Sequence, residues 1–178
     1  MELYDGKPFL YFLIIHKNII VWNENNSETK QARLVLKKML DYFDIKMPEI
    51  IISENGKPFF KKSRIHFNYS HSKNFIACAI ASSEVGIDIE EIDRIVSDRI
   101  AEKYLESEKD KLKRIELWVK KESFSKLKGL GLQMQFQNIR IEEIKEKNHF
   151  IQRKNYMCSI YSEENNIEFK ELKLDISI

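Results

Sequence analysis

Residues 75–90, with the sequence FIACAIASSEVGIDIE, limit the possible folds of this chain more than any other stretch. The stretch is apolar at almost every position, except for a polar break at Ser82–Glu84 and carboxylates near its end. Short continuous apolar runs bounded by turn residues are typical of strands that are buried on both faces. We therefore expect two buried strands joined at Ser82–Glu84.

Helices and strands are expected on both sides of this stretch. Helical periodicity predicts helices over residues 28–43, 96–105 and 108–128. Shorter apolar runs predict strands at residues 9–15, 18–22 and 65–72, a short strand with an Asn-Gly turn at residues 49–60, and further strands in the C-terminal part. Ser27 is the expected cap of the first helix, Ser107 with Asp110 resembles a capping box, and Gly129 and Gly131 would end the long helix. The order of elements is mixed α and β in both halves.

The composition is that of an ordinary globular protein. Of the 178 residues, 43% are hydrophobic and 33% charged, which suits one domain or two small packed halves. The net charge of +2 does not indicate nucleic acid as a partner. Cys78 and Cys158 are isolated, so neither a disulfide framework nor a thiolate metal site is expected. The apolar residues 9–15 are too few to span a bilayer, and we expect a cytoplasmic protein without a membrane partner.

Asp88 and Glu90 lie one residue apart at the end of the second apolar run. In a strand this spacing places both carboxylates on one face, while Ile89 points to the other. A carboxylate pair at a strand end is commonly exposed, but these surroundings are apolar, and Gly86 allows another group to approach the backbone closely. Like charges in an apolar setting require compensation, and oxygen ligands favour Mg²⁺. We therefore predict a magnesium site at this strand.

The predicted long helix contains a third carboxylate and a cation for phosphate. Glu122 and Lys126, in WVKKESFSK, are four residues apart and share a helical face. Considered alone, they would be interpreted as a surface ion pair, which contributes little to stability. They become candidates for the site only in combination with the carboxylates of the strand.

Two further polar clusters lie upstream. In NYSHS, residues 68–72, Ser70 and His71 can offer hydroxyl, imidazole and backbone donors to a phosphate. No acidic partner lies at local spacing, so a Ser-His hydrolase is not favoured. In NGKPF, Lys57 adds a cation. It follows a turn, and the stiff Pro58 after it limits how its side chain is presented.

The order of these motifs resembles that of the 4′-phosphopantetheinyl transferases, in particular the larger two-lobed type. NGKPFF, FNYSHS, VGIDIE and WVKKESFSKLKG follow one another over residues 54–132. Members of this family move the phosphopantetheine arm of coenzyme A to a serine of an apo carrier protein and release 3′,5′-ADP. The resemblance therefore implies this reaction, with Mg²⁺ as cofactor, and coenzyme A and an apo acyl or peptidyl carrier protein as partners.

The resemblance also implies roles for individual residues. Asp88, Glu90 and Glu122 would hold Mg²⁺ against the pyrophosphate of coenzyme A. Asp88, Glu122 and Lys126 would be catalytic, with Glu122 as the candidate base that accepts the serine proton. The residues implied in coenzyme A binding are Lys57, Ser70, His71 and Lys121, with Arg33 for the 3′-phosphate.

The implied fold is mixed α+β, with two similar α/β halves related by a pseudo-twofold and the site in the cleft between them. We expect the halves at residues 1–90 and 91–178, the first with the coenzyme A contacts and the second with the long helix. A monomer is expected because one chain supplies both halves. The basic stretch 108–118 is either a docking surface for an acidic carrier protein or a solvated helix face. Its basic residues are Lys109, Lys111, Lys113 and Arg114.

Two features depart from the family pattern. Gly129-Leu130-Gly131 stands where the family usually has Gly-Lys-Gly, and the chain is short for the two-lobed type. Two other functions are therefore compared with the transferase: a non-catalytic module that binds coenzyme A or a carrier protein, and a Mg²⁺-dependent phosphohydrolase. The complete set of carboxylates and helix lysines argues against the first, and the upstream clusters argue against the second.

Overall fold

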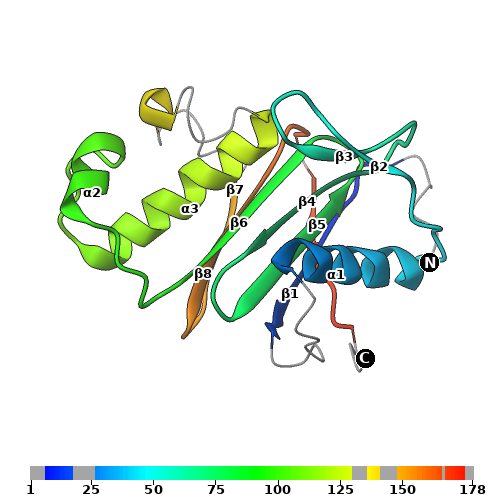
Figure 1. The fold of residues 1–178 in the computed structure, drawn as a ribbon, viewed down its shortest axis with the longest axis horizontal. Coiled ribbons are helices and arrows are strands. Elements are labelled where there is room, and N and C mark those ends of the chain that lie inside the picture. The colour runs from blue at the N-terminus through cyan, green and yellow to red at the C-terminus, as the bar shows by residue number, and fades with distance from the viewer. Residues whose placement is uncertain (1–6, 18–26, 130–135, 141–147, 166, 175–178) are drawn as a thin grey trace.

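The computed structural model describes residues 7–17, 27–129, 136–140, 148–165 and 167–174. These residues form nine strands, three α-helices and a short 3-10 helix, which confirms the predicted mixed α+β class (Figure 1). In chain order the elements are β1 (Leu10–His16), α1 (Glu28–Tyr42), β2 (Ile50–Ile52), β3 (Pro58–Phe60), β4 (His66–His71), β5 (Phe75–Ala81), β6 (Val85–Glu91), α2 (Asp98–Tyr104), α3 (Lys111–Lys128), η2 (Phe136–Asn138), β7 (Asn148–Gln152), β8 (Tyr156–Ser162) and β9 (Phe169–Glu171).

The strands form three sheets. The first has the order β4-β5-β1-β9 and is antiparallel except for the parallel pair of β1 and β9. The second is antiparallel with the order β6-β8-β7, and β2 pairs with β3 in a separate hairpin. The two buried strands predicted on either side of Ser82–Glu84 are β5 and β6. They are consecutive in the chain but belong to different sheets.

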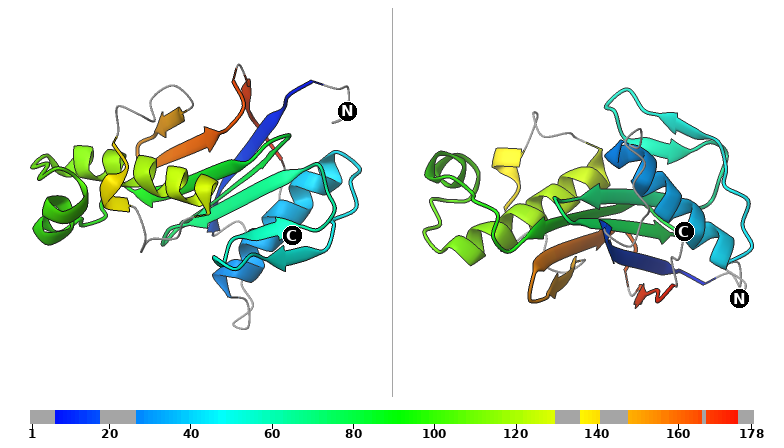
Figure 2. Two further views of the ribbon diagram at one scale, coloured as in Figure 1. Left: turned by 90° about the horizontal axis from the view of Figure 1, so that it is seen from above. Right: turned by 60° about the horizontal axis from the view of Figure 1, so that its bottom comes forward.

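Each of the two larger sheets has a helix on one face (Figures 1 and 2). Helix α1 packs on the four-stranded sheet, where Leu36 and Met39 contact a core that includes Leu13 of β1. The opposite side of β1 and β5 joins β6 and β8 in a second core, which contains Phe12 and Ile87. Helix α3 lies against β6 and β8. Val85, Ile87 and Ile89 of β6 face this second core, and Asp88 on the other face of the strand is buried.

Gly86 permits the close approach of β6 and α3. A Cβ atom at this position would lie 2.0 Å from the carbonyl oxygen of Ser123 and 2.4 Å from the backbone nitrogen of Leu127. No side chain fits there without a shift of backbone. The expectation that Gly86 allows a close backbone approach is confirmed, and the approaching group is the helix that carries Glu122 and Lys126.

The helix ends agree with the sequence in two cases and differ in one. Ser27 caps α1, and Gly129 ends α3 in the left-handed conformation, as predicted. The expected cap at Ser107 is wrong, because Asp110 is the N-cap of α3 and accepts a hydrogen bond of 2.8 Å from the backbone of Lys113. Ser107 has a positive φ of 60° and belongs to the turn that precedes the helix.

The sheets do not divide the chain at residue 90. Strand β6 crosses residue 90 and pairs with β8, and β9 returns to pair with β1, so the four-stranded sheet contains strands from both ends of the chain. The division into halves at residues 1–90 and 91–178 and the pseudo-twofold that relates them stay predictions. The strand expected at 18–22, Leu130 and Gly131 lie outside the described residues. No described helix is both long and apolar enough to cross a membrane.

Candidate active site

Ser70, Asp88 and Lys126 form a hydrogen-bonded cluster, although they are far apart in the sequence. They come from the end of β4, the middle of β6 and the last turn of α3. Lys126 Nζ donates to Asp88 Oδ1 at 2.6 Å and to Ser70 Oγ at 2.9 Å, and Ser70 Oγ donates to the same Asp88 oxygen at 2.7 Å. Asp88 Oδ2 is buried without a hydrogen-bond partner. The structure thus brings together three residues that the sequence predicted for one site.

Glu122 lies one turn before Lys126 on α3, and the charges of Asp88 and Lys126 act on its carboxyl group. Burial and, next, the charge of Asp88 raise the pKa of Glu122 to about 7, although Lys126 and Arg94 act in the opposite direction. Burial also disfavours the charged form of Lys126, but Asp88 and Glu122 outweigh this effect and raise the pKa of the lysine. At neutral pH the site therefore combines a charged ammonium with a carboxyl group that titrates near that pH.

Glu90 lies on the same face of β6 as Asp88, but it pairs with a different cation. Its carboxylate forms an ion pair with Arg94. The Arg94 guanidinium also lies over the ring of Trp118, 4.9 Å from the ring centroid. Arg94 was not predicted as part of the site, because the sequence does not show how the chain turns after β6.

Asp88, Glu90 and Glu122 are the predicted ligands of Mg²⁺. Among the residues that the structure describes, no group of three or more His, Cys, Asp or Glu side chains is arranged to hold a metal ion. The charges of Asp88 and Glu90 are compensated by Lys126 and Arg94 instead. The donor set nevertheless fits Mg²⁺, because all three groups are carboxylates, Asp88 Oδ2 is buried and unpartnered, and burial together with the charge of Asp88 raises the pKa of Glu122. The magnesium assignment stays a prediction.

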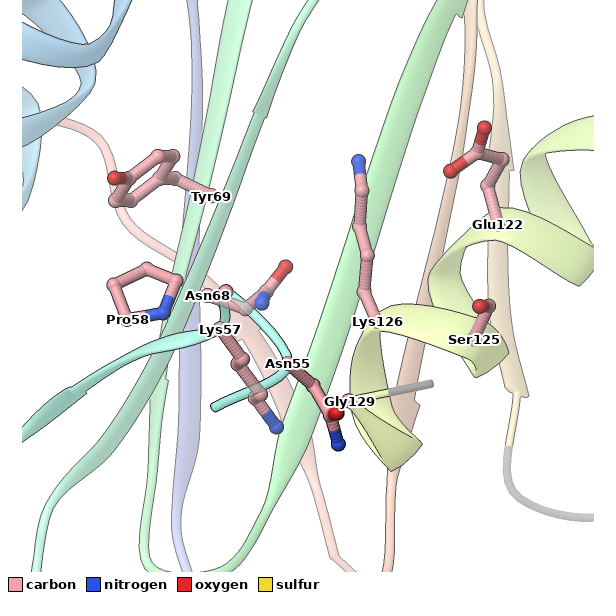
Figure 3. Close-up of a pocket in the computed structure, with 10 residues that line it drawn as sticks. Asn55, Lys57, Pro58, Asn68, Tyr69, Glu122, Ser125, Lys126 and Gly129 are labelled. Carbon is pink, nitrogen blue, oxygen red and sulfur yellow. The ribbon is translucent and has the colours of Figure 1, made fainter. Parts of the chain in front are cut away.

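A pocket of about 320 Å³ opens beside this cluster. The turn before β3 and strand β4 form one wall, and α3 forms the other. In Figure 3 the Lys126 side chain lies between Tyr69 of β4 and Glu122 of α3. The lining residues are Asn55, Gly56, Lys57, Pro58, Asn68, Tyr69, Glu122, Ser125, Lys126 and Gly129. The volume is in the range of small-molecule sites, and the pocket lies between parts of the chain that are distant in sequence.

Lys57 lines the pocket, but its ammonium group binds to Leu127 and Glu84. Lys57 Nζ donates to the Leu127 carbonyl oxygen at 2.8 Å and forms an ion pair with Glu84. A hydrogen bond with His66, followed by the bond with Lys57, lowers the pKa of Glu84 to about 2, against the effect of burial. Lys57 thus ties the turn of the pocket wall to the C-terminal end of α3, where a cation is favoured by the helix dipole.

Two predicted residues are not brought into the cluster. Lys121 is buried, and its Nζ donates a hydrogen bond of 2.6 Å to the carbonyl oxygen of Tyr104, at the end of α2. Arg33 lies on the exposed face of α1, because the residues at the helical positions around it, Ala32 and Val35, face the sheet. The positions of Lys121 and Arg33 do not support the phosphate contacts expected of them.

His71 joins a second charged group at the end of β4. Its Nδ1 lies 3.2 Å from Oε2 of Glu28, and Oε1 of Glu28 accepts a hydrogen bond of 2.9 Å from Lys17 Nζ. Burial lowers the pKa of His71, and Glu28 partly offsets this effect. Lys17 and Glu28 were not predicted as part of the site. The sequence holds only a weak signal for them, because Lys17 follows an apolar strand and Glu28 begins a helix.

Two elements of this site, β6 and α3, fall within a region that matches a known family. Residues 84–176, just over half of the chain, match the 4′-phosphopantetheinyl transferase superfamily. The chain belongs to this superfamily. The matched residues 84–176 of this chain include Asp88, Glu90, Glu122 and Lys126. Ser70 and the pocket wall formed by β4 and the turn before β3 precede this region.

Curated proteins of the same superfamily are similar to part of the chain. The 4′-phosphopantetheinyl transferase gsp of Aneurinibacillus migulanus is 38% identical over 112 residues, which cover 56% of this chain and 46% of the relative. The 4′-phosphopantetheinyl transferase psf-1 of Bacillus pumilus is 34% identical over 105 residues, with coverages of 52% and 45%. The 4′-phosphopantetheinyl transferase Sfp of Bacillus subtilis (strain 168) is 36% identical over 107 residues, with coverages of 53% and 46%. The chain thus spans about half the length of the curated relatives that it matches.

Proposed function

We propose that this chain transfers the 4′-phosphopantetheine arm of coenzyme A to a serine of an apo acyl or peptidyl carrier protein, with Mg²⁺ as cofactor. The observation that carries the proposal is the cluster of Ser70, Asp88 and Lys126 beside Glu122, at a pocket lined from distant parts of the chain. The names of the relatives, all 4′-phosphopantetheinyl transferases, support the same reaction.

The proposed position of coenzyme A places its pyrophosphate at the cluster. The Lys126 ammonium and the Ser70 hydroxyl are donors that can bind phosphate oxygens, and charge-assisted bonds of this kind are the stronger ones. Asp88, Glu90 and Glu122 would hold Mg²⁺, which would neutralise charge on the pyrophosphate during transfer. Carboxylates that bind a metal no longer need a cationic side chain as partner, so Lys126 would become available for the phosphate.

The proposed reaction forms a bond between the carrier serine Oγ and the β-phosphorus of coenzyme A. The bond between that phosphorus and the bridging oxygen breaks, and 3′,5′-ADP leaves with the electron pair. Glu122 is proposed to accept the serine proton, directly or through a water molecule. Lys126 would stabilise the negative charge that develops on the phosphate oxygens.

The proposed docking surface for the carrier protein is the exposed beginning of α3. Lys109, Lys111 and Lys113 are exposed there and suit an acidic partner. Arg114 does not belong to this surface, because its guanidinium group bonds to the Val96 and Glu108 carbonyl oxygens and to Asp98. We also propose a cytoplasmic monomer, which is supported by a pocket whose two walls come from one chain.

The test is a transfer reaction with purified components. The chain is incubated with coenzyme A, Mg²⁺ and one of several apo carrier proteins, and the intact mass of the carrier is measured. The proposal expects a mass gain of one phosphopantetheine group on at least one carrier. Binding of coenzyme A without a mass gain on any carrier would favour the non-catalytic binding module, and release of inorganic phosphate would favour the phosphohydrolase.

A further inference from the structure

Glu28 lies between two basic side chains at the start of α1. Oε1 of Glu28 accepts a hydrogen bond of 2.9 Å from Lys17 Nζ, and Oε2 lies 3.2 Å from His71 Nδ1. The Lys17 side chain is only 5% exposed, whereas that of Glu28 is 50% exposed. The carboxylate therefore lies on the solvent side of a buried ammonium group, where a ligand can reach it.

The two carboxylate oxygens of Glu28 have the contacts that a bound anion would have. The hydrogen bond from Lys17 lowers the pKa of Glu28, so the group is ionised at neutral pH. Its position as the first residue of α1 adds the favourable end of the helix dipole. Lysine, imidazole and helix N-terminus together are the groups that proteins use to bind phosphate, and here a side chain of the chain itself occupies them.

This second charged group adjoins the candidate active site. His71 directly follows Ser70 on β4, and the charges of both Lys126 and Asp88 act on His71. Coenzyme A carries two separate anionic groups, its pyrophosphate and the phosphate on its ribose. In the proposed function the pyrophosphate lies at Ser70 and Lys126, and the adjacent basic side chains, Lys17 and His71, would face the ribose phosphate.

We propose that Glu28 is an internal counter-ion that competes with the ribose phosphate of coenzyme A for Lys17 and His71. The inference rests on the proposed function and concerns the selectivity of the same site. To bind Lys17 and His71, the ribose phosphate must displace the Glu28 carboxylate, whereas a coenzyme A without that phosphate leaves the ion pairs intact. The chain therefore discriminates weakly between coenzyme A and 3′-dephospho-coenzyme A.

The experiment measures the dissociation constants of both nucleotides by calorimetry, in the presence of Mg²⁺ and without a carrier protein. The variants are Glu28→Gln, the double variant Lys17→Gln/Glu28→Gln, and Asp41→Asn as a matched control. Asp41 is a carboxylate on the same helix, paired with Lys37 and distant from the site. Denaturation in urea verifies that each variant is folded, since the loss of Glu28 also removes a favourable charge from the helix start.

In the wild type, both nucleotides should bind within about threefold of each other, because the gain from the phosphate is offset by the loss of the Glu28 ion pairs. Glu28→Gln should tighten the binding of coenzyme A by about tenfold and leave that of the dephospho form unchanged, since the phosphate then no longer has to displace a carboxylate from Lys17 and His71. The double variant should lose this gain, and Asp41→Asn should match the wild type.

A ratio of the two dissociation constants that Glu28→Gln leaves unchanged would overturn the inference while the proposed function stands. The same holds for a gain that persists in the double variant. If neither nucleotide binds to any folded variant, the proposed function fails, and the inference fails with it. The two failures are thus distinguished by the wild-type measurement.

Discussion

Lys126 Nζ lies 2.6 Å from Asp88 Oδ1 and joins the last turn of α3 to the middle of β6. The two partners differ in exposure: the Asp88 side chain is 4% exposed, and that of Lys126 is 30% exposed. Removal of the lysine would leave a buried carboxylate without its cation. Removal of the aspartate would leave a lysine whose long side chain can reach water.

Substitution of the two partners should therefore have unequal effects on stability. Lys126→Met should lower the free energy of unfolding by about 2 kcal/mol, because it leaves an uncompensated buried charge. Asp88→Asn should lower it by less than about 1 kcal/mol, and both variants should lose transfer activity. Urea denaturation measures the first effect and the carrier mass assay the second. Equal losses of stability would contradict the inferred asymmetry of the pair.

The contact of β6 with α3 predicts a strong effect at Gly86. Gly86→Ala should destabilise the protein by about 3 kcal/mol, because the added Cβ collides with helix backbone. Gly129→Ala is the matched control: its φ is 64°, but the nearest atom would be 3.5 Å away. Its cost should be about 1 kcal/mol, from backbone strain alone. Comparable midpoints in urea for the two variants would show that the close approach is not required.

The raised pKa of Glu122 predicts a stability that falls as the pH rises. Because the folded-state pKa is about 7 and the ordinary value is 4.5, the folded form holds the proton more tightly over this range. The stabilisation is fully present below pH 4.5 and is lost as the pH rises through about 7. Without divalent cations, Glu122→Gln should therefore be more stable than the wild type at pH 8, by about 2 kcal/mol, and by clearly less at pH 5.

Glu116 on the same helix supplies a control of opposite sign. Burial acts to raise its pKa, but Lys120 and Lys113 outweigh burial and lower it. Its contribution to stability is present above the ordinary pKa of 4.5 and is lost at lower pH, so Glu116→Gln should destabilise the protein at pH 8. If both variants shifted the free energy of unfolding at pH 8 in the same direction, the interpretation of Glu122 would be wrong.

The bond of Lys57 to the end of α3 predicts a coupling between the pocket wall and the helix. Lys57→Met removes a charge from the Leu127 carbonyl oxygen and from Glu84, and should cost about 1 kcal/mol of stability. Lys61→Met, which breaks an exposed pair with Glu49, should cost less than about 0.5 kcal/mol. Thermal unfolding of both variants measures the difference. A loss in Lys61→Met as large as that in Lys57→Met would remove the special role of Lys57.

The sequence predicted the parts of the fold and site that depend on local pattern. The buried strands around Ser82–Glu84, the helix with Glu122 and Lys126, and the close approach at Gly86 all follow from periodicity or residue size. The pairing of β6 with β8 depends on contacts across the chain and has no local signal.

The positions that differ from the sequence-based expectation concern where long side chains point. The sequence shows that Lys121 lies beside Glu122, but successive helical residues point about 100° apart, so one faces α2 and the other the cluster. Arg94 and Lys17 were not predicted, because neither residue lies in a regular helix or strand whose geometry would indicate where its side chain points. Their positions outside regular elements give no direction, and only the folded chain brings them to Glu90 and Glu28.

The most direct test of the central claim is the stoichiometry of transfer. Wild-type protein, coenzyme A, Mg²⁺ and an apo carrier protein are incubated, and both the carrier mass and the release of 3′,5′-ADP are quantified, with Asp88→Ala as a folded control. We expect one molecule of 3′,5′-ADP for each carrier that gains a phosphopantetheine group, and neither product with Asp88→Ala. A mass gain that Asp88→Ala preserves in full, or no gain on any carrier with the wild type, would contradict the account.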